Sequence, residues 1–142
     1  MPAATLDELK LNTRVKLVAL WCAVMFCYVY GDYFALYIPK HAEKLVNGDT
    51  LLNSPVKVFA ASVLMCIPPL VIIASAIVRA QMARLMNIIF GFVYTAIMLL
   101  IAVTSIPVTP EISAYVFYAL LESVMTIAII WQAWEWPKNA VR

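Results

Sequence analysis

The stretch WCAVMFCYVYGDYFALYIP, residues 21–39, is apolar enough to form a membrane helix, although it carries an acid, Asp32. Small side chains recur every four residues along it and just before it. They are Ala19, Ala23, Cys27, Gly31 and Ala35. Residues four apart share one face of a helix, and a ridge of small side chains lets the backbone of a neighbouring helix approach closely. We therefore predict a packed membrane helix in which Asp32, next to this ridge, faces protein rather than lipid.

The composition favours a bilayer as the solvent of the whole chain. Of 142 residues, 65% are hydrophobic and 13% are charged. A water-soluble fold with this composition would expose large apolar patches. The formal net charge is only +2, and no basic run is interleaved with aromatic residues, so nucleic acid is not expected as a partner.

Four apolar segments are long enough to cross a membrane. We predict helices over about 14–38, 56–78, 85–106 and 112–134. Each has about 22 residues or more, which at roughly 1.5 Å per residue spans a hydrocarbon core of about 30 Å. Short connections between the segments favour antiparallel neighbours. The sequence therefore predicts an all-α polytopic membrane protein, in which residues 1–142 form one domain built as an antiparallel four-helix transmembrane bundle.

The segments that flank and connect the four helices also allow structural predictions. Residues 1–13 form a short polar segment before the first helix, and residues 79–84 are predicted to form a tight basic turn. Pro107 and Pro110 bracket a second tight turn. In the longest connection, residues 42–46 are predicted to form a short surface helix before an Asn-Gly-Asp break.

The distribution of lysine and arginine predicts the orientation in the membrane. One side of the bundle would hold Lys10, Arg14, Lys16, Arg79, Arg84, Lys138 and Arg142, and the other would hold Lys40, Lys44 and Lys57. Membrane proteins carry an excess of basic residues in their cytoplasmic loops. Seven basic residues against three therefore predict that both termini lie in the cytoplasm.

Two carboxyl groups fall inside the predicted spans, Asp32 in the first and Glu122 in the fourth. An aspartate there costs about 2.5 to 3.5 kcal/mol on insertion scales, so membrane acids usually face protein or a wet cavity. The helical rise places Asp32 roughly 9 Å and Glu122 about 16 Å below the membrane face opposite the termini. Tyr118, one turn before Glu122, would lie near the level of Asp32.

Two consecutive prolines, Pro68 and Pro69, interrupt the second predicted helix. A proline removes a backbone donor and so frees the carbonyl four residues earlier, here the carbonyls of Leu64 and Met65. Tyr94 of the third helix lies at about the same depth as the acid of the fourth helix. We predict one polar layer, in which that acid, once protonated, can donate a hydrogen bond to a freed carbonyl.

These positions define the candidate residues. The predicted ligand or proton site comprises Asp32, Glu122, Tyr28, Tyr94, Tyr118 and Asn87. Helix packing is assigned to the small ridge of the first helix, to Pro68 and Pro69, and to Gly91 of the third helix.

The sequence gives little support for a metal site or a catalytic nucleophile. The three cysteines, Cys22, Cys27 and Cys66, lie in apolar stretches without a CxxC spacing, and His41 is the one histidine. Packing as small apolar side chains is the preferred interpretation of the cysteines, and a redox role is the weaker alternative. No metal site, cofactor or catalytic residue is predicted.

We expect a non-enzymatic membrane module that binds or passes a small ligand or a proton through this polar core. A homo-oligomer is expected because a small four-helix unit encloses little volume. A structural or accessory subunit of a membrane assembly is an alternative, since polar stripes also hold helices together. An enzyme acting on a lipid or quinone-like substrate is a weaker alternative, because no serine–histidine pair or metal cluster supports it.

Three stretches resemble a known family: WCAVMFCYVYGDYFALYIP at 21–39, LMNIIFGFVYTAIMLL at 85–100 and WQAWEWPK at 131–138. In these the chain is similar to a family of small, uncharacterised bacterial four-helix integral membrane proteins, known as a domain of unknown function. The resemblance implies the four-helix architecture and a bacterial inner membrane. It implies no activity and no site residue.

Overall fold

The computed structural model of the protein describes residues 11–106 and 112–137. Within these ranges all regular structure is helical. The helices are α1 (Thr13–Ala35), α2 (His41–Val46), α3 (Pro55–Ile77), α4 (Ala80–Thr104) and α5 (Ser113–Trp134). The prediction of an all-α fold is confirmed for this part of the chain. The expectations for residues 1–10 and for the turn at 107–111 lie outside the described residues.

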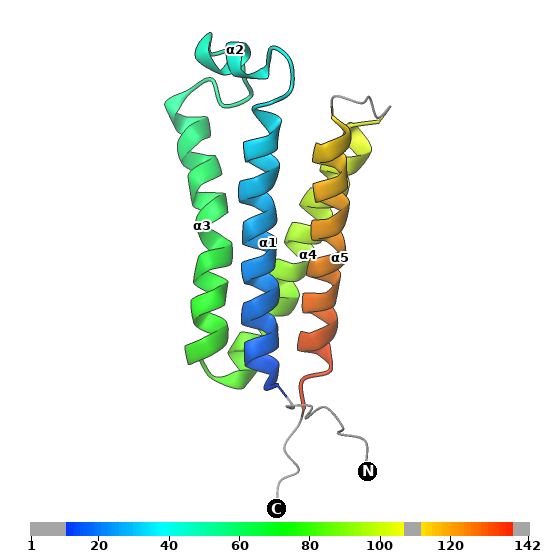
Figure 1. The fold of residues 1–142 in the computed structure, drawn as a ribbon. Helices are drawn as coiled ribbons and strands as arrows, with labels where there is room; N and C mark the ends of the chain where they lie inside the picture. The colour runs from blue at the N-terminus through cyan, green and yellow to red at the C-terminus, as the bar shows by residue number, and fades with distance from the viewer. Residues whose placement is uncertain (1–10, 107–111, 138–142) are drawn as a thin grey trace, which may run out of the picture.

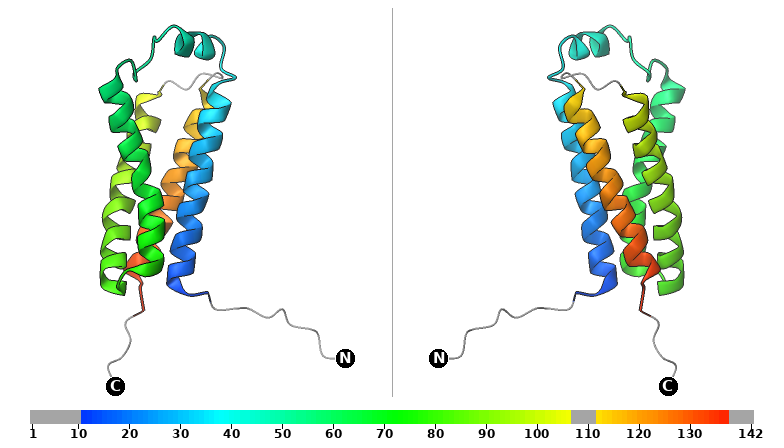
Figure 2. Two further views of the ribbon diagram at one scale, coloured as in Figure 1. Left: turned by 90° about the vertical axis from the view of Figure 1, so that its left-hand side faces the viewer. Right: turned by 90° about the vertical axis from the view of Figure 1, so that its right-hand side faces the viewer.

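The four long helices lie side by side, and each is long and apolar enough to cross a membrane. Figure 1 shows that α1 begins and α5 ends at one end of the molecule, hereafter the terminal end. The short α2 lies across the opposite end, hereafter the α2 end, between the end of α1 and the start of α3. In the side views of Figure 2 the pair α1 and α5 diverges from the pair α3 and α4 toward the α2 end.

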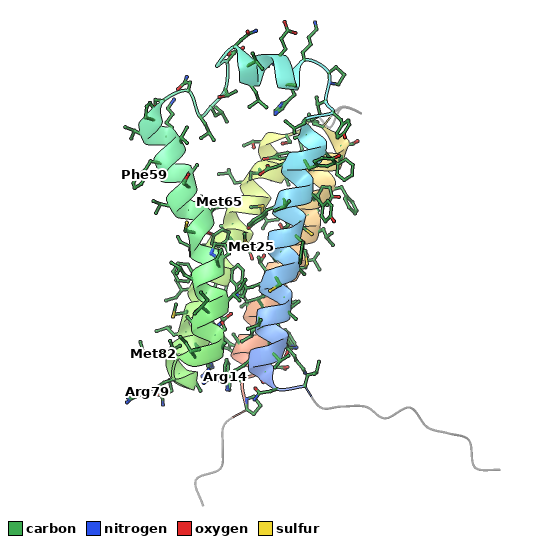
Figure 3. All side chains as sticks on the ribbon, turned by 60° about the vertical axis from the view of Figure 1, so that its left-hand side comes forward. Arg14, Met25, Phe59, Met65, Arg79 and Met82 are labelled. Atoms are coloured by element: carbon green, nitrogen blue, oxygen red, sulfur yellow. The ribbon has the colours of Figure 1, made fainter. Side chains whose placement is uncertain are left out.

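Most of the apolar surface of these helices points outward. Only 17–33% of the residues in their apolar stretches are buried within the molecule. Phe26, Phe59 and Phe117 are 64%, 71% and 60% exposed, and Figure 3 shows Phe59 projecting away from the bundle. An outer surface of this kind is unfavourable in water and favourable in hydrocarbon.

Helix α1 ends at Ala35, three residues before the predicted end at 38. The next amides bond to carbonyls only three residues back, with Tyr37 N to Phe34 O at 3.0 Å and Ile38 N to Ala35 O at 3.2 Å. This tightened turn leads into Pro39, which disfavours helical geometry in the residue before it. The short surface helix predicted at 42–46 is present as α2.

Helix α4 begins at Ala80, so the basic turn predicted at 79–84 is wrong. Only Val78 and Arg79 separate α3 from α4. The residues from Ala80 to Arg84 are all favourable in helices, which allows α4 to start early. Arg84 is therefore part of a helix, and its side chain reaches across to α5, where Nε donates to Ala133 O at 3.1 Å.

The buried face of α1 does not coincide with the predicted ridge of small residues. Leu17, Trp21 and Val24 are 0% exposed, whereas Ala19 at the start of the ridge is exposed. Gly31 is the part of the ridge that packs as predicted, since a Cβ atom there would lie 3.8 Å from Tyr118 of α5. The large side chains take the buried face because they remove more apolar surface from the solvent.

Helices α4 and α5 make the most extensive contact in the bundle. A Cβ atom on Gly91 would lie only 2.6 Å from Ile130 Cγ1, so this glycine permits the close approach of the two helices. One turn later Thr95 Oγ1 donates to Thr126 Oγ1 at 2.7 Å. The packing role predicted for Gly91 agrees with this geometry.

Candidate functional site

Asp32 and Glu122, the acids inside the long apolar helices, line one cavity between α1 and α5. The cavity has a volume of about 100 Å³ and is hereafter the carboxyl cavity. Its polar lining residues are Tyr28, Asp32, Tyr115, Tyr118 and Glu122. Met65 and Met98 contribute apolar walls from α3 and α4, and Figure 3 shows Met65 pointing from α3 toward the interior.

Small residues create this space. Gly31 of α1 and Ala119 of α5 both line the cavity and are buried, so the two helices leave a gap beside the ring of Tyr118. Glu122 lies on the following turn of α5 and is only 4% exposed. Asp32 directly follows Gly31 and is exposed. The prediction that Asp32 faces protein is therefore only half right, because it lies at the mouth of the cavity with Glu122 at the bottom.

The polar groups that line the carboxyl cavity have few charge or hydrogen-bond partners among the described residues. In the part of the chain that the structure describes, no lysine, arginine or histidine lines the cavity. Tyr28 Oη is buried and has no hydrogen-bond partner among the described residues. The volume corresponds to about three water molecules, each of which needs two to four polar partners. The cavity can thus hold a few water molecules between its hydroxyl and carboxyl groups, and together these can form a short chain that transfers a proton.

A second cavity of about 400 Å³ connects this site to the α2 end and is hereafter the outer cavity. Asp32 and Tyr115 line both cavities, so they form the passage between them. The outer cavity is also lined by His41 and Lys44 of α2. The carboxyl pair is therefore approached from the α2 end, past a basic group on the short helix.

The terminal half of the bundle contains a buried hydrogen-bonded layer. Asn87 accepts a hydrogen bond from Trp21 Nε1 at 2.8 Å and donates through Nδ2 to Ser75 Oγ at 2.7 Å. Nδ2 also donates to Ala83 O at 2.8 Å. Trp21, Ser75, Ala83 and Asn87 are all 0% exposed. This Trp21–Asn87 layer joins α1, α3 and α4 through buried hydrogen bonds.

The carbonyl freed by Pro68 is satisfied by Tyr94, not by Glu122. Tyr94 Oη donates to Leu64 O at 2.5 Å, and the ring of Tyr94 packs edge-on against Trp21 with 5.7 Å between centroids. The sequence predicts that Glu122 can donate to the carbonyl of Leu64 or of Met65; at Leu64 this place is taken by Tyr94 of the adjacent α4. Glu122 consequently keeps its carboxyl group for the cavity.

The structure brings together part of the predicted site. Tyr28, Asp32, Tyr118 and Glu122 all line the carboxyl cavity. Tyr94 lies beside Tyr28, with 6.4 Å between ring centroids, but its hydroxyl is used inside the bundle. The remaining predicted residue, Asn87 of α4, belongs to the Trp21–Asn87 layer and does not line the cavity.

One further feature concerns metal binding. Cys22, Cys27 and Cys66 are free. Among the described residues no three histidine, cysteine or acidic side chains are grouped closely enough to hold a metal ion. The donor set of the carboxyl cavity is therefore two carboxyl groups and tyrosine hydroxyls.

Comparison with known proteins gives one match. A family of unknown function, DUF6326, matches residues 6–142. The chain belongs to DUF6326. The expected resemblance to an uncharacterised family is thereby confirmed. No curated protein and no solved structure matches this DUF6326 chain.

Tyr115 is the polar residue of the carboxyl cavity that is absent from the site predicted from the sequence. It links the carboxyl cavity to the outer cavity. Its spacing on α5 indicates that it belongs with Tyr118 and Glu122, because positions 115, 118 and 122 fall on one helical face. The sequence does not predict that Met65 and Met98 line the cavity, since apolar side chains of α3 and α4 look alike in sequence whether they face lipid or a cavity.

Proposed function

We propose that this DUF6326 protein is a multi-pass membrane protein that takes up a proton at Asp32 and Glu122 from the α2 end of the bundle. The observation that carries the proposal is one cavity lined by two carboxyl groups from different helices, without a basic side chain among the described lining residues. A carboxyl group that takes up a proton loses its charge, which removes the main cost of its position in a membrane.

The membrane arrangement is part of the same proposal. We infer that α1, α3, α4 and α5 cross the bilayer of a bacterial inner membrane as an antiparallel bundle. Their length, their apolar composition and their exposed apolar side chains support this. The excess of basic residues toward the terminal end supports a cytoplasmic location for both termini. The α2 end would then face the opposite side.

The size of the carboxyl cavity favours a proton over a larger ligand. Pockets for drug-sized molecules measure about 300 to 1,000 Å³, whereas this cavity has about 100 Å³. A quinone or a lipid chain would not fit beside Glu122 without separating the helices. A divalent cation such as Ca²⁺ needs about six to eight oxygen ligands, more than two carboxyl groups provide.

The order of groups suggests a route for the proton. It would enter through the outer cavity, pass Asp32 and Tyr115 at the shared boundary, and reach Glu122 at the bottom. The polar groups of the Trp21–Asn87 layer are bonded to one another, so this layer would oppose continuation to the terminal end between α1, α3 and α4. The arrangement suits a protein that binds a proton from one side and releases it after a change in helix packing, rather than an open channel.

Infrared spectroscopy of the full chain in a lipid film tests this proposal. The film is perfused with buffers of rising pH, and the carbonyl stretch of protonated carboxyl groups is followed. Carboxyl groups shielded from water absorb apart from exposed ones, and only the band of the shielded groups is followed. We expect this band to titrate in the wild type, to be weaker in Glu122→Gln and to be lost in the double variant Asp32→Asn with Glu122→Gln. Glu43→Gln, an exposed acid on α2, is the matched control and should retain the band.

Two results would decide against the proposal. One is a titrating band that survives in the double variant. The other is a change on adding Na⁺ or K⁺ at constant pH that exceeds the effect of protons, which would assign the site to a metal cation. A pH-sensitive dye inside sealed vesicles then shows whether uptake of the proton leads to transport.

A structural or accessory role is the second candidate, and one observation favours it. Much of the buried polar surface is used between helices, as in the Trp21–Asn87 layer and the Thr95–Thr126 bond. The exposed position of Ala19 on α1 leaves a small side chain at which a helix of another membrane protein can approach closely. Purification with a fixed stoichiometric partner would support this role, and a stable homo-oligomer alone would weaken it.

A further inference from the structure

A larger cavity lies at the terminal end of the bundle, far from the carboxyl pair. It has a volume of about 720 Å³ and lies where α1 and α4 begin and α5 ends; it is hereafter the terminal cavity. Its polar lining residues are Asn12, Thr13, Arg14, Gln81 and Arg84, with Trp136 as an aromatic wall. Its volume lies within the range of about 300 to 1,000 Å³ typical of ligand pockets.

Arg14 is fixed in place by the end of α3. Its Nη1 donates to Ser75 O at 2.9 Å and to Ala76 O at 3.1 Å. Its guanidinium carbon lies 5.7 Å from the centre of the Trp136 ring, a cation–π distance. Arginine at the carboxyl end of a helix stabilises the unpaired carbonyls there. The side chain is thus held in a defined orientation at the cavity wall.

Arg84 is fixed in the same manner by the end of α5. Its Nε donates to Ala133 O at 3.1 Å and its Nη2 donates to Trp134 O at 3.3 Å. A guanidinium has five N–H groups. Because Arg14 and Arg84 each make two such bonds, about three N–H groups on each remain for another acceptor.

The charged side chains that line the terminal cavity among the described residues are Arg14 and Arg84, and both are positive. No acidic residue lines it in the part of the chain that the structure describes. Glu135, the described acid nearest in sequence to the end of α5, accepts a hydrogen bond from Trp131 Nε1 at 2.8 Å. The first turn of α4 also borders the cavity, and its N-cap residue Arg79 makes no side-chain capping bond. Helix amino ends add to the attraction of two guanidiniums for an anion.

We propose that the terminal cavity binds the phosphate of an anionic phospholipid headgroup. Two oriented guanidiniums match the geometry of phosphate oxygens, and basic pockets between membrane helices on the cytoplasmic side are suited to such headgroups. Trp131 and Trp134 at the same end are 62% and 65% exposed, and tryptophan favours the headgroup level of a bilayer. The site is independent of the proton site proposed above.

Native mass spectrometry of the full chain in detergent tests this inference. The protein is titrated with dioleoyl phosphatidylglycerol and, separately, with dioleoyl phosphatidylcholine. We expect tighter binding of the anionic lipid by the wild type, and a loss of this selectivity by roughly tenfold or more in Arg14→Gln and in Arg84→Gln. Selectivity is a ratio within one protein sample, so a general loss of folded protein does not imitate it.

Arg79→Gln is the matched control. Arg79 lies at the same end, is exposed and does not line the cavity; Figure 3 shows it projecting outward at the turn between α3 and α4, away from Arg14. This variant should keep the wild-type selectivity. Arg14→Lys retains one positive charge without the planar fork, and an intermediate selectivity is expected. If Arg14→Gln does not fold, Arg84→Gln and Arg14→Lys decide the question.

The inference is overturned by any of three results. The wild type shows equal affinity for the two lipids; Arg79→Gln loses as much selectivity as the two cavity variants, which indicates a diffuse surface charge; or inorganic phosphate displaces the anionic lipid and binds with the same arginine dependence, which assigns the cavity to a soluble phosphate compound.

Discussion

Replacing Tyr94 with phenylalanine tests how the bundle satisfies the carbonyl that Pro68 leaves without a backbone donor. Tyr94 Oη donates to Leu64 O at 2.5 Å, and the tyrosine is 0% exposed. Phenylalanine keeps the edge contact with Trp21 but removes the donor. An unpaired buried acceptor costs about 1 to 3 kcal/mol. We expect the free energy of unfolding to fall by that amount.

A double-mutant cycle with Pro68→Ala separates this effect from the loss of packing. Alanine at position 68 restores an N–H group to α3, and this group can bond to Leu64 O in the ordinary helical manner. In this background Tyr94→Phe should cost only about 0.5 to 1.5 kcal/mol, the net value of one hydrogen bond. Tyr30→Phe, at a tyrosine that is 53% exposed, is the control and should cost nothing measurable.

The assay is equilibrium unfolding in mixed micelles of a mild detergent and dodecyl sulfate. Tryptophan fluorescence is a suitable signal because the Trp21 ring packs on the Tyr94 ring at 5.7 Å. All four members of the cycle are measured in the same micelles. If Tyr94→Phe costs the same with and without Pro68, the hydroxyl does not serve the freed carbonyl and the reasoning is refuted.

Four further substitutions test the packing. Asn87→Leu should lower the free energy of unfolding by about 1 to 3 kcal/mol, because it leaves the Trp21 N–H unpaired; unchanged stability would contradict the hydrogen-bonded layer. Gly91→Ala should cost about 1 to 3 kcal/mol through overpacking, since its Cβ would lie 2.6 Å from Ile130 Cγ1. Adding Ile130→Ala should recover part of that loss, and no recovery would show that another contact limits the space. Thr126→Val should cost only about 0.6 kcal/mol, the average for a hydrogen bond between membrane helices; a loss of several kcal/mol would assign the threonine a larger role.

The number and type of the helices could be predicted because they depend on local properties. Four apolar runs of membrane length are visible without knowledge of tertiary contacts. The boundaries were less accurate where tertiary contacts decide them. The start of α4 at Ala80 places Arg84 within reach of Ala133 O, a contact that basic composition alone does not reveal.

The candidate site was predicted in part, for a related reason. Helical spacing and depth correctly grouped Tyr118 and Glu122 with Asp32 in one cavity. Depth alone does not distinguish two donors at the same level, so the sequence does not show that Tyr94, rather than Glu122, donates to Leu64 O. A polar residue inside an apolar helix suggests function, which predicts Asn87 in the site. Its side chain instead bonds to Trp21 of α1, to Ser75 of α3 and to Ala83 of its own helix.

The central claim is that Glu122 lies at the bottom of a cavity that water reaches only from the α2 end. Ala119 lines that cavity, so Ala119→Cys, in a chain whose native cysteines are replaced, reports on access. Sealed vesicles of each orientation are treated with Ag⁺, and protection from a maleimide is measured after denaturation. Ser54→Cys at the start of α3 and Gln81→Cys at the start of α4 identify the two faces. The account predicts that Ala119→Cys reacts only from the side on which Ser54→Cys reacts; reaction from the side of Gln81→Cys, or from neither side, would contradict it.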